Sequence, residues 1–281
     1  MNADVPSTEP APPPAAEGEG PVRVSRPEPG VVVLTLDAPH RRNALSRGMM
    51  DALGRALADG SADRDVAAIV LAANGPAFSA GHDLKELSAH RADADGGRAF
   101  YTETMDACAR LMQDIVRTPK PVIAAVEGVA TAAGCQLVAT CDLAVAASTS
   151  TFATPGVDIG LFCSTPMVAL SRNVPRKRAM EMLLLGDRLS AEEAARYGLV
   201  NRVVAPERVR DEALAMARTI AAKSRLTVAI GKEAFYRQIE MPLAEAYEYA
   251  AAVMVENMMA ADAAEGICAF LEKRPPVWKG T

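Results

Sequence analysis

The sequence is short of the residues that several kinds of function require. It has three histidines among 281 residues, and no cysteine or carboxylate joins them at metal-ligand spacing. A metal site is therefore not expected. The same scarcity argues against a nucleophile built on Cys163 or Ser164, because none of His40, His82 and His90 has an evident orienting partner in the sequence.

The cysteines are few, odd in number and scattered. All five lie in apolar surroundings, at positions 108, 135, 141, 163 and 268. This usage is typical of reduced, mostly buried thiols and not of a disulfide framework. We expect a cytoplasmic protein, since the N-terminus also lacks the basic and then apolar pattern of a signal peptide.

Long apolar runs and an excess of positive charge are also missing. No apolar run reaches the length of about 18 residues that a membrane span needs, so none is expected. The net charge of −5 does not suggest a nucleic-acid partner. A hydrophobic content of 50% and a charged content of 23% are ordinary for a soluble globular protein. The length suits one large domain, or one domain with an appendage.

The chain divides into three parts by composition and pattern. Residues 1–21 hold six prolines together with Ala, Glu and Gly, and such a stretch cannot bury a core. We expect a disordered or polyproline-like tail there. Over residues 22–205, β-like apolar runs alternate with helical periodicities, and residues 206–281 show helical spacing throughout. This order predicts an α/β core followed by a helical C-terminal region.

Runs of β-like apolar residues predict the individual strands of this core. The expected strands are residues 31–36, 66–72, 122–126, 143–147 and 200–204. Apolar residues at every fourth position from Leu45 to Leu57 predict a helix with one buried face. Ser190 and Glu193 have the spacing of a capping box at the start of a short helix. A mobile loop is expected at 88–98.

Two turns rich in small residues each follow an apolar run and lead into a helix. Residues 78–84 read FSAGHDL, and residues 128–136 read GVATAAGCQ. Small residues let a backbone pass close to a ligand, and the first N–H groups of a helix have no internal acceptor. Two such turns side by side would direct two N–H groups at one oxygen. Such an oxyanion hole indicates acyl chemistry.

With these turns, the chain resembles the crotonase superfamily, also called the enoyl-CoA hydratase/isomerase family. Further matches follow in family order: KPVIAAV at 120–126, CDLA at 141–144, the stretch 191–203 and AFLEKR at 269–274. The resemblance covers roughly residues 22–281. The stretch 134–166 is most similar to one particular subgroup of that family.

The resemblance implies a ClpP-like spiral of ββα units with a C-terminal helical region used in trimerisation, and often a dimer of trimers. The ligand would be an acyl-CoA or enoyl-CoA thioester of fatty-acid or related metabolism. Coenzyme A would enter as part of that substrate, so no separate cofactor is expected. The protein would be an enzyme of the lyase or isomerase type.

Roles for individual residues also come from the resemblance. The two oxyanion N–H groups would belong to His82 and Ala133. The positions that contact CoA in the family, two of them in a neighbouring subunit, correspond here to Ala44, Ala80, Leu84, Lys85, Phe270 and Lys273.

The carboxylates that family hydratases use are missing. Their two glutamate positions are Gln136 and Gly156 here, and an aspartate position of other members is Ser164. General acid–base catalysis contributes ~10²–10⁴-fold, and one oxyanion donor about 10²–10³-fold. An amide orients water but does not shuttle protons near neutral pH. We therefore expect binding of acyl-CoA and stabilisation of a thioester enolate, with poor hydration.

Several alternatives stay open at this level. Asp158 or His82 is a candidate proton-transfer group, but Asp158 could instead pair with a backbone N–H, and the His82 ring could be merely solvated. Asp83 could cap the helix behind its turn. A cationic contact of Lys85 with CoA phosphates competes with simple solvation.

Two further functions also remain possible. One is a non-catalytic acyl-CoA binding or regulatory protein, which keeps the pocket but lacks the acid–base pair. The other is a different thioester reaction, such as decarboxylation or thioester hydrolysis.

Overall fold

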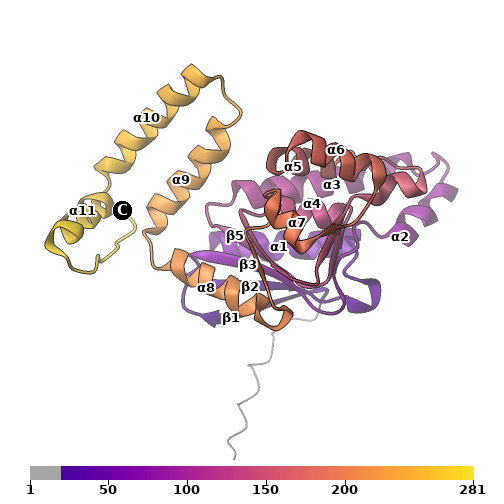
Figure 1. Cartoon of the computed structure of the whole chain (residues 1–281), viewed down its shortest axis with the longest axis horizontal. Coiled ribbons are helices and arrows are strands. Elements are labelled where there is room, and N and C mark those ends of the chain that lie inside the picture. Colours follow the sequence, from indigo (N-terminus) through magenta and orange to yellow (C-terminus); the bar gives the residue numbers. More distant parts are fainter. Residues whose placement is uncertain (1–19) are drawn as a thin grey trace, which may run out of the picture.

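A computed structural model describes residues 20–281, so the predicted tail lies outside the described residues except for its last two. Two sheets form the core of the described chain (Figure 1). The larger sheet contains, in spatial order, β1 (Val22–Glu28), β2 (Val31–Leu36), β3 (Ala68–Ala73), β5 (Val122–Val126), β7 (Leu143–Ala147) and β10 (Arg202–Val204). The smaller contains β4 (Ala77–Ser79), β6 (Val129–Thr131), β8 (Thr151–Ala153) and β9 (Leu189–Ser190).

From β3 to β8, successive strands alternate between the two sheets. The pairs β3 and β4, β5 and β6, and β7 and β8 each place the first strand in the larger sheet and the second in the smaller. Only β1 and β9 run antiparallel to their neighbours among the described strands. Helical segments follow each pair, which gives the repeated ββα unit that the resemblance implied. These segments are α2 (Leu84–Ala89), η2 (His90–Ala92), α3 (Arg98–Arg117), α4 (Ala133–Thr140), η3 (Pro155–Ile159), α5 (Pro166–Asn173) and α6 (Arg176–Leu185).

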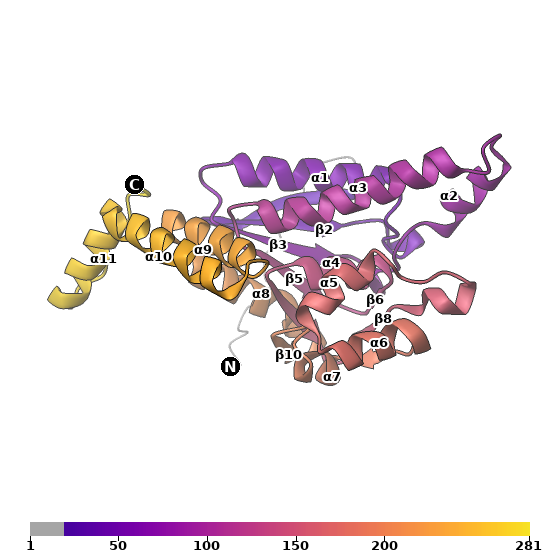
Figure 2. The ribbon, with the colours of Figure 1, turned by 90° about the horizontal axis from the view of Figure 1, so that it is seen from above.

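Helices cover both faces of the larger sheet (Figure 2). In β3, Ile69 and Leu71 point to the face covered by α1 (Arg47–Ala62) and α3, whereas Ala68 and Val70 point to α8 (Val209–Ala221). The pleat sends alternate side chains to opposite faces, so a strand covered on both sides reads as one continuous apolar run. This is why the apolar runs in the sequence predicted these parallel strands.

Short elements were not predicted. The three-residue strands β4, β6 and β8 are too brief to show a period of two residues, and no helix was predicted over the eight residues of α5. The expected mobile loop at 88–98 instead contains the end of α2 and η2. The capping box is confirmed: the Ser190 hydroxyl accepts the Glu193 N–H at the start of α7 (Ala191–Arg196).

Three helices extend away from the core at the C-terminus (Figure 1). They are α9 (Arg225–Gln238), α10 (Leu243–Met259) and α11 (Ala261–Glu272). The predicted helical region begins earlier, at residue 206, and so includes η4 (Pro206–Arg208) and α8. Because α8 packs on the sheet through Val209, Ala213 and Ala217, the projecting part starts only with α9. The oligomerisation role of this region stays a prediction.

A buried ion pair fastens α9 to the core. The Lys232 ammonium lies 2.7 Å from the Asp142 carboxylate and also donates to the carbonyl oxygens of Ile115 and Lys120. The Tyr236 hydroxyl donates to the same carboxylate at 2.9 Å, as does the Val122 N–H at 2.7 Å. Burial lowers the pKa of Lys232, and the Asp142 charge opposes that shift.

We expect Lys232→Met to lower the free energy of unfolding by about 3–5 kcal/mol, because it leaves a buried carboxylate without its cation. The matched control on the same helix is Arg237→Ala, which breaks an exposed pair with Glu233. That change should cost about 1 kcal/mol or less. Urea unfolding at one protein concentration measures both. Equal losses in the two variants would show that the buried pair does not fasten the helix.

Candidate active site

The two predicted turns touch each other backbone to backbone. A Cβ added at Gly134 would lie 2.2 Å from the Ser79 carbonyl oxygen. One added at Gly81 would lie 2.9 Å from the Ala132 Cβ and 3.1 Å from the Ala133 nitrogen, and Gly81 has a φ of +83°. No side chain fits at either position without moving the backbone. The glycines therefore set how closely the turns approach each other.

A third backbone segment, residues 42–45, runs beside the first turn. The Leu45 N–H donates to the Gly81 carbonyl at 2.7 Å, and the Ala80 N–H donates to the Arg42 carbonyl at 3.0 Å. The Ser79 hydroxyl donates to the Asn43 carbonyl at 2.8 Å. These bonds hold the first turn from the side opposite the second turn.

Asn43 is the centre of this segment, and sequence reasoning missed it. It is fully buried, with a φ of +51° that asparagine tolerates better than most residues. Its side-chain oxygen accepts the Ala38 N–H at 2.8 Å, and its amide donates to the carbonyls of Asn74 and Ala77. The sequence did contain one indication of this turn. An asparagine that follows a proline closely at the end of a strand is typical of a turn with a left-handed residue.

Two backbone N–H groups at the contact have no protein acceptor within residues 20–281. They belong to His82, in the first turn, and to Ala133, the first residue of α4. Ala132, just before it, has φ of 51° and ψ of −120°, a combination that is strained for a residue with a side chain. Its own N–H donates to the Ala153 carbonyl at 2.9 Å. The strained residue thus directs the chain into α4 beside Gly81.

The His82 ring is largely buried and has one defined tautomer. Its Nδ1 lies 3.2 Å from the Leu45 carbonyl oxygen, which can only accept, so Nδ1 carries the proton. Nε2 is then unprotonated and carries a lone pair that can accept a hydrogen bond. It is buried and has no partner in the described part of the chain. Burial lowers the pKa of His82, while the Leu45 carbonyl and the Glu86 charge oppose the shift. The alternative of a solvated ring is wrong.

Asp83 caps the following helix. Its carboxylate accepts the N–H groups of Lys85 and Glu86 at 3.0 and 3.2 Å, and the Arg41 guanidinium lies 3.3 Å away. Because the carboxylate accepts N–H groups of the first turn of α2, the helix-cap interpretation is confirmed.

Gln136 is buried on α4 and faces α3. The Cys108 thiol lies 3.9 Å from its side-chain oxygen. Burial raises the pKa of Cys108 to about 11, so this contact is made by a neutral thiol. Thr104, one helical turn earlier, has a buried hydroxyl with no partner among the described residues. Sequence reasoning missed both α3 residues; their only signal is a spacing of four on one helix face.

At Gly156, where the resemblance puts the second glutamate of the family hydratases, the space is filled by the chain itself. An added Cβ would lie 2.5 Å from the Leu161 carbonyl oxygen and 2.9 Å from the Cys163 sulfur. The position is therefore not an empty slot for a longer side chain.

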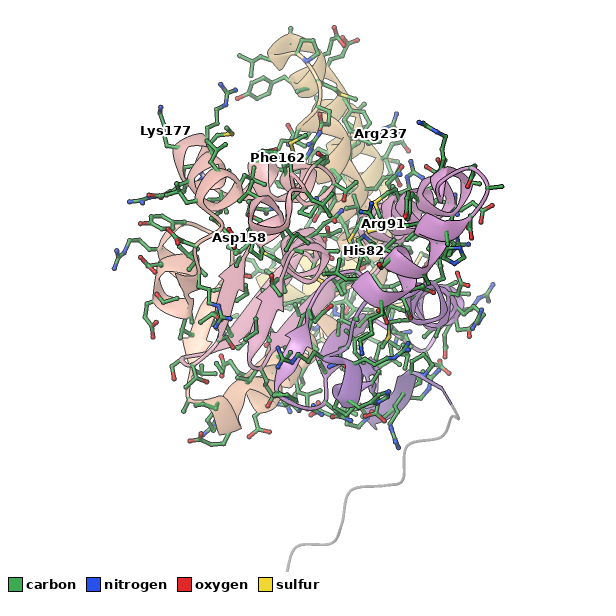
Figure 3. All side chains as sticks on the ribbon, turned by 90° about the vertical axis from the view of Figure 1, so that its right-hand side faces the viewer. His82, Arg91, Asp158, Phe162, Lys177 and Arg237 are labelled. Carbon is green, nitrogen blue, oxygen red and sulfur yellow. The ribbon has the colours of Figure 1, made fainter. Side chains whose placement is uncertain are left out.

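Asp158 does not join the other predicted catalytic residues. It is exposed on η3, and its carboxylate oxygens approach Gly186, 3.3 Å from where a Cβ would stand. Figure 3 labels it on a different element from His82 and apart from it. No backbone N–H of the described chain donates to this carboxylate, so its expected loop pairing is not seen either.

The predicted CoA-contact positions fall into two groups. Ala44 and Ala80 are half-buried beside the first turn, and Leu84 and Lys85 are exposed at the start of α2. Of these four positions, Ala44 lines a cavity of about 250 Å³. The other two positions, Phe270 and Lys273, belong to the C-terminal end of α11, on the opposite side of the molecule (Figure 1).

Other candidate chemistry finds little support in the geometry. Burial raises the pKa of Cys163, and the exposed Ser164 hydroxyl donates to the Phe162 carbonyl. Residues 20–281 contain no group of three His, Cys, Asp or Glu side chains placed to hold a metal ion. No helix in that range is long and apolar enough to cross a membrane.

Comparison with known proteins shows which family shares this arrangement. The family model described as enoyl-CoA hydratase/isomerase matches residues 26–281, so the chain belongs to that family. It is 47% identical over 266 residues to the mitochondrial enoyl-CoA hydratase domain-containing protein 3 of Rattus norvegicus, covering 95% of this chain and 87% of that protein.

Two crystal structures extend this similarity to the fold. An enoyl-CoA hydratase of Mycobacterium smegmatis superposes with a TM-score of 0.88 at 53% identity, over 92% of this chain and 99% of that one. The human enoyl Coenzyme A hydratase domain-containing protein 3 gives 0.87 at 46% identity, over 92% and 100%. The predicted crotonase fold is confirmed. So is the similarity to one subgroup, the domain-containing protein 3 group.

The predicted cytoplasmic location is wrong, because the rat, mouse and human relatives are named as mitochondrial proteins. The prediction relied on the cysteines. Four of the five are buried and all are free. Free, buried thiols are typical of a reducing compartment, but they do not distinguish one such compartment from another.

We expect Gly134→Ala to lower the free energy of unfolding by roughly 1–3 kcal/mol, because its methyl group must displace the Ser79 carbonyl. The matched control is Gly231→Ala, another glycine within a helix but with open space around it. That change should instead raise stability by up to about 1 kcal/mol. Urea unfolding measures both variants. A gain in stability at both positions would show that the turns do not depend on close contact.

The buried His82 ring predicts a pH dependence. The pKa of His82 in the folded chain is lowered below the ordinary value of about 6.5. As pH falls, His82 therefore becomes protonated at a higher pH in the unfolded chain than in the folded one. Its stabilising contribution is present above that value and is lost as pH falls through the folded pKa. Unfolding followed from about pH 7.5 to pH 5 should show a smaller slope for His82→Gln. Equal slopes in the unchanged protein and in the variant would contradict the prediction.

Proposed function

We propose that the protein binds acyl-CoA or enoyl-CoA thioesters and stabilises their enolate. The observation that carries this proposal is the contact between the two turns, where the N–H groups of His82 and Ala133 have no protein acceptor in the described chain. A thioester oxygen placed between them would accept both hydrogen bonds. The oxygen gains negative charge as the enolate forms, and each such donor is worth ~10²–10³-fold in rate.

His82 would then contribute twice. Its backbone N–H would hold the thioester oxygen, and its buried, unprotonated Nε2 would accept the proton that leaves the α-carbon. Gln136 would orient substrate or water. Asp158 is a weaker candidate for proton transfer than His82, because it is exposed and directed towards Gly186.

Efficient hydration does not follow from this arrangement. Hydration needs a base for water as well as an acid for the α-carbon, and the two family carboxylates are absent. Gln136 faces a neutral thiol, and the backbone fills the space beside Gly156. The same two observations favour the alternative, a non-catalytic acyl-CoA binding or regulatory protein. Decarboxylation or thioester hydrolysis is a third possibility that needs fewer carboxylates.

We also propose a homo-oligomer, a trimer or a dimer of trimers, built with the C-terminal helices. Their exposed apolar side chains support this, including Phe270 with 82% and Met259 with 78% of its surface accessible. A soluble monomer seldom exposes such a contiguous apolar area. In the oligomer, Phe270 and Lys273 would contact the CoA of a neighbouring subunit. The substrate would bring all of the coenzyme A, without a separate cofactor.

The first experiment is steady-state hydration of crotonyl-CoA by the purified protein. We expect turnover far below the usual ~1–10³ s⁻¹ of enzymes, together with measurable binding of an acyl-CoA by calorimetry. Adding Gly156→Glu to Gln136→Glu should not restore hydration, since the new side chain collides with the Leu161 carbonyl. Rapid hydration that survives Gln136→Ala would contradict the proposal.

Exchange of the α-protons of an acyl-CoA with deuterated solvent, followed by NMR, separates the enzyme from the binding protein. Enolate formation should give exchange that His82→Gln reduces by about 10²-fold or more, the usual size of general-base catalysis. His90→Gln is the control. Tight binding without exchange would favour the non-catalytic alternative, and absence of acyl-CoA binding would overturn both.

A further inference from the structure

A second cavity, of about 850 Å³, lies away from the touching turns. It stands where β3 and β5 begin, and its walls come from residues 61–67, 119–120, the start of α9 and the last four residues of the chain. The turns follow β4 and β6, near α2, at the other end of the molecule from the C-terminus (Figure 1). The volume is in the range of about 300–1,000 Å³ that is usual for small-molecule sites.

Five cationic side chains line this cavity. None of them lies within 4.0 Å of a carboxylate oxygen of residues 20–281. They are Arg64, Lys120, Lys223, Arg225 and Lys279.

Two of these cations are held by backbone oxygens. Lys120 donates to the Asp63 carbonyl, and Arg225 donates to the Arg64 carbonyl. Burial lowers the pKa of Lys120, and the guanidinium groups of Arg225 and Arg26 lower it further, against the charges of Asp63 and Asp65. The cations are thus crowded together.

The negative charges at the cavity do not offset the five cations. The Asp63 carboxylate already lies 2.5 Å from the Arg26 guanidinium. Asp65 is exposed next to the cavity wall, and the Asp262 carboxylate accepts the backbone N–H groups of Lys279 and Gly280, which line the cavity. The N-terminus of α9, a helix of 14 residues that begins at Arg225, adds positive potential. An anion entering here would gain from every one of these cationic groups.

The rest of the wall is apolar and includes an aromatic ring. Trp278 is held in place, because its indole N–H donates to the Ala222 carbonyl at 2.9 Å and its ring covers Gly266. Val66 and Leu226 contribute further apolar surface. A site with cations on one part and a fixed aromatic ring on another suits a ligand that carries both phosphates and a planar base.

We propose that this cavity binds a phosphorylated nucleotide, with its phosphates at the cationic side chains and its base on the apolar wall beside Trp278. Arginine matches phosphate oxygens with paired donors, and lysine contributes a point charge. This binding is separate from the proposed thioester chemistry and does not depend on it.

Trp278 makes the proposal directly testable, since it is the only tryptophan in the sequence. ADP is titrated into the full-length protein while tryptophan emission is followed. We expect a saturable change whose midpoint rises with salt, because the cations are exposed to screening. Pyrophosphate and adenosine, titrated alone, should each bind more weakly than ADP.

The variant Lys223→Glu with Lys279→Glu tests the charges. Both side chains are exposed and make no hydrogen bond within the described chain, so the fold should be kept. ADP affinity should fall at least about tenfold, the effect of losing one charged hydrogen bond or more. The matched control, Lys177→Glu with Arg188→Glu, makes the same change in net charge at two other exposed positions. It should leave the affinity unchanged.

Three results would overturn the proposal. The first is emission that does not change at millimolar ADP. The second is ADP binding that calorimetry detects but Trp278 does not report, which would place the nucleotide elsewhere. The third is an emission change that follows protein concentration and not ADP, which would show that a second copy of the chain fills the cavity.

Discussion

The approach of two turns, backbone against backbone, is the constraint on which the rest of the site depends. Gly81 meets Ala132 and Ala133, and Gly134 meets Ser79, at distances that leave no room for a Cβ. Close approach needs residues without side chains, but it also needs both strands before the turns to end side by side. The pairing of β4 with β6 in the smaller sheet supplies that placement.

The contact makes the two N–H groups a property of the backbone. Asn43 and the residues around it hold the first turn in place through hydrogen bonds to carbonyls. The strained Ala132 directly precedes α4. Side chains nearby can therefore change without moving the donors. A carboxylate is different: it belongs to one side chain and is lost by one substitution. This is how the two N–H groups can keep their places in a chain that has Gln136 and Gly156 where the resemblance puts the glutamates of the family hydratases.

The sequence indicates the parts of this structure that rest on local pattern. Continuous apolar runs predicted the parallel strands, and small-residue turns predicted the contact at Gly81 and Gly134, because both signals lie within a few adjacent residues. Contacts between distant segments could not be predicted in the same way. Asp142 and Lys232 are 90 positions apart, and Trp278 meets residue 222. Nor does a sequence reveal that the Leu161 carbonyl stands where a side chain at position 156 would extend.

Burial decides what the remaining titratable groups can do. Asp158 is the carboxylate that the sequence favoured, yet it is exposed, where water competes for its hydrogen bonds. His82 is neutral because its surroundings penalise the charged form, and the Leu45 carbonyl determines which nitrogen keeps the proton. A buried lone pair without a partner costs about 1–3 kcal/mol, and that cost is recovered only when a donor arrives. Within residues 20–281, this nitrogen and the N–H groups of His82 and Ala133 are the polar groups at the two turns for which the fold provides no partner.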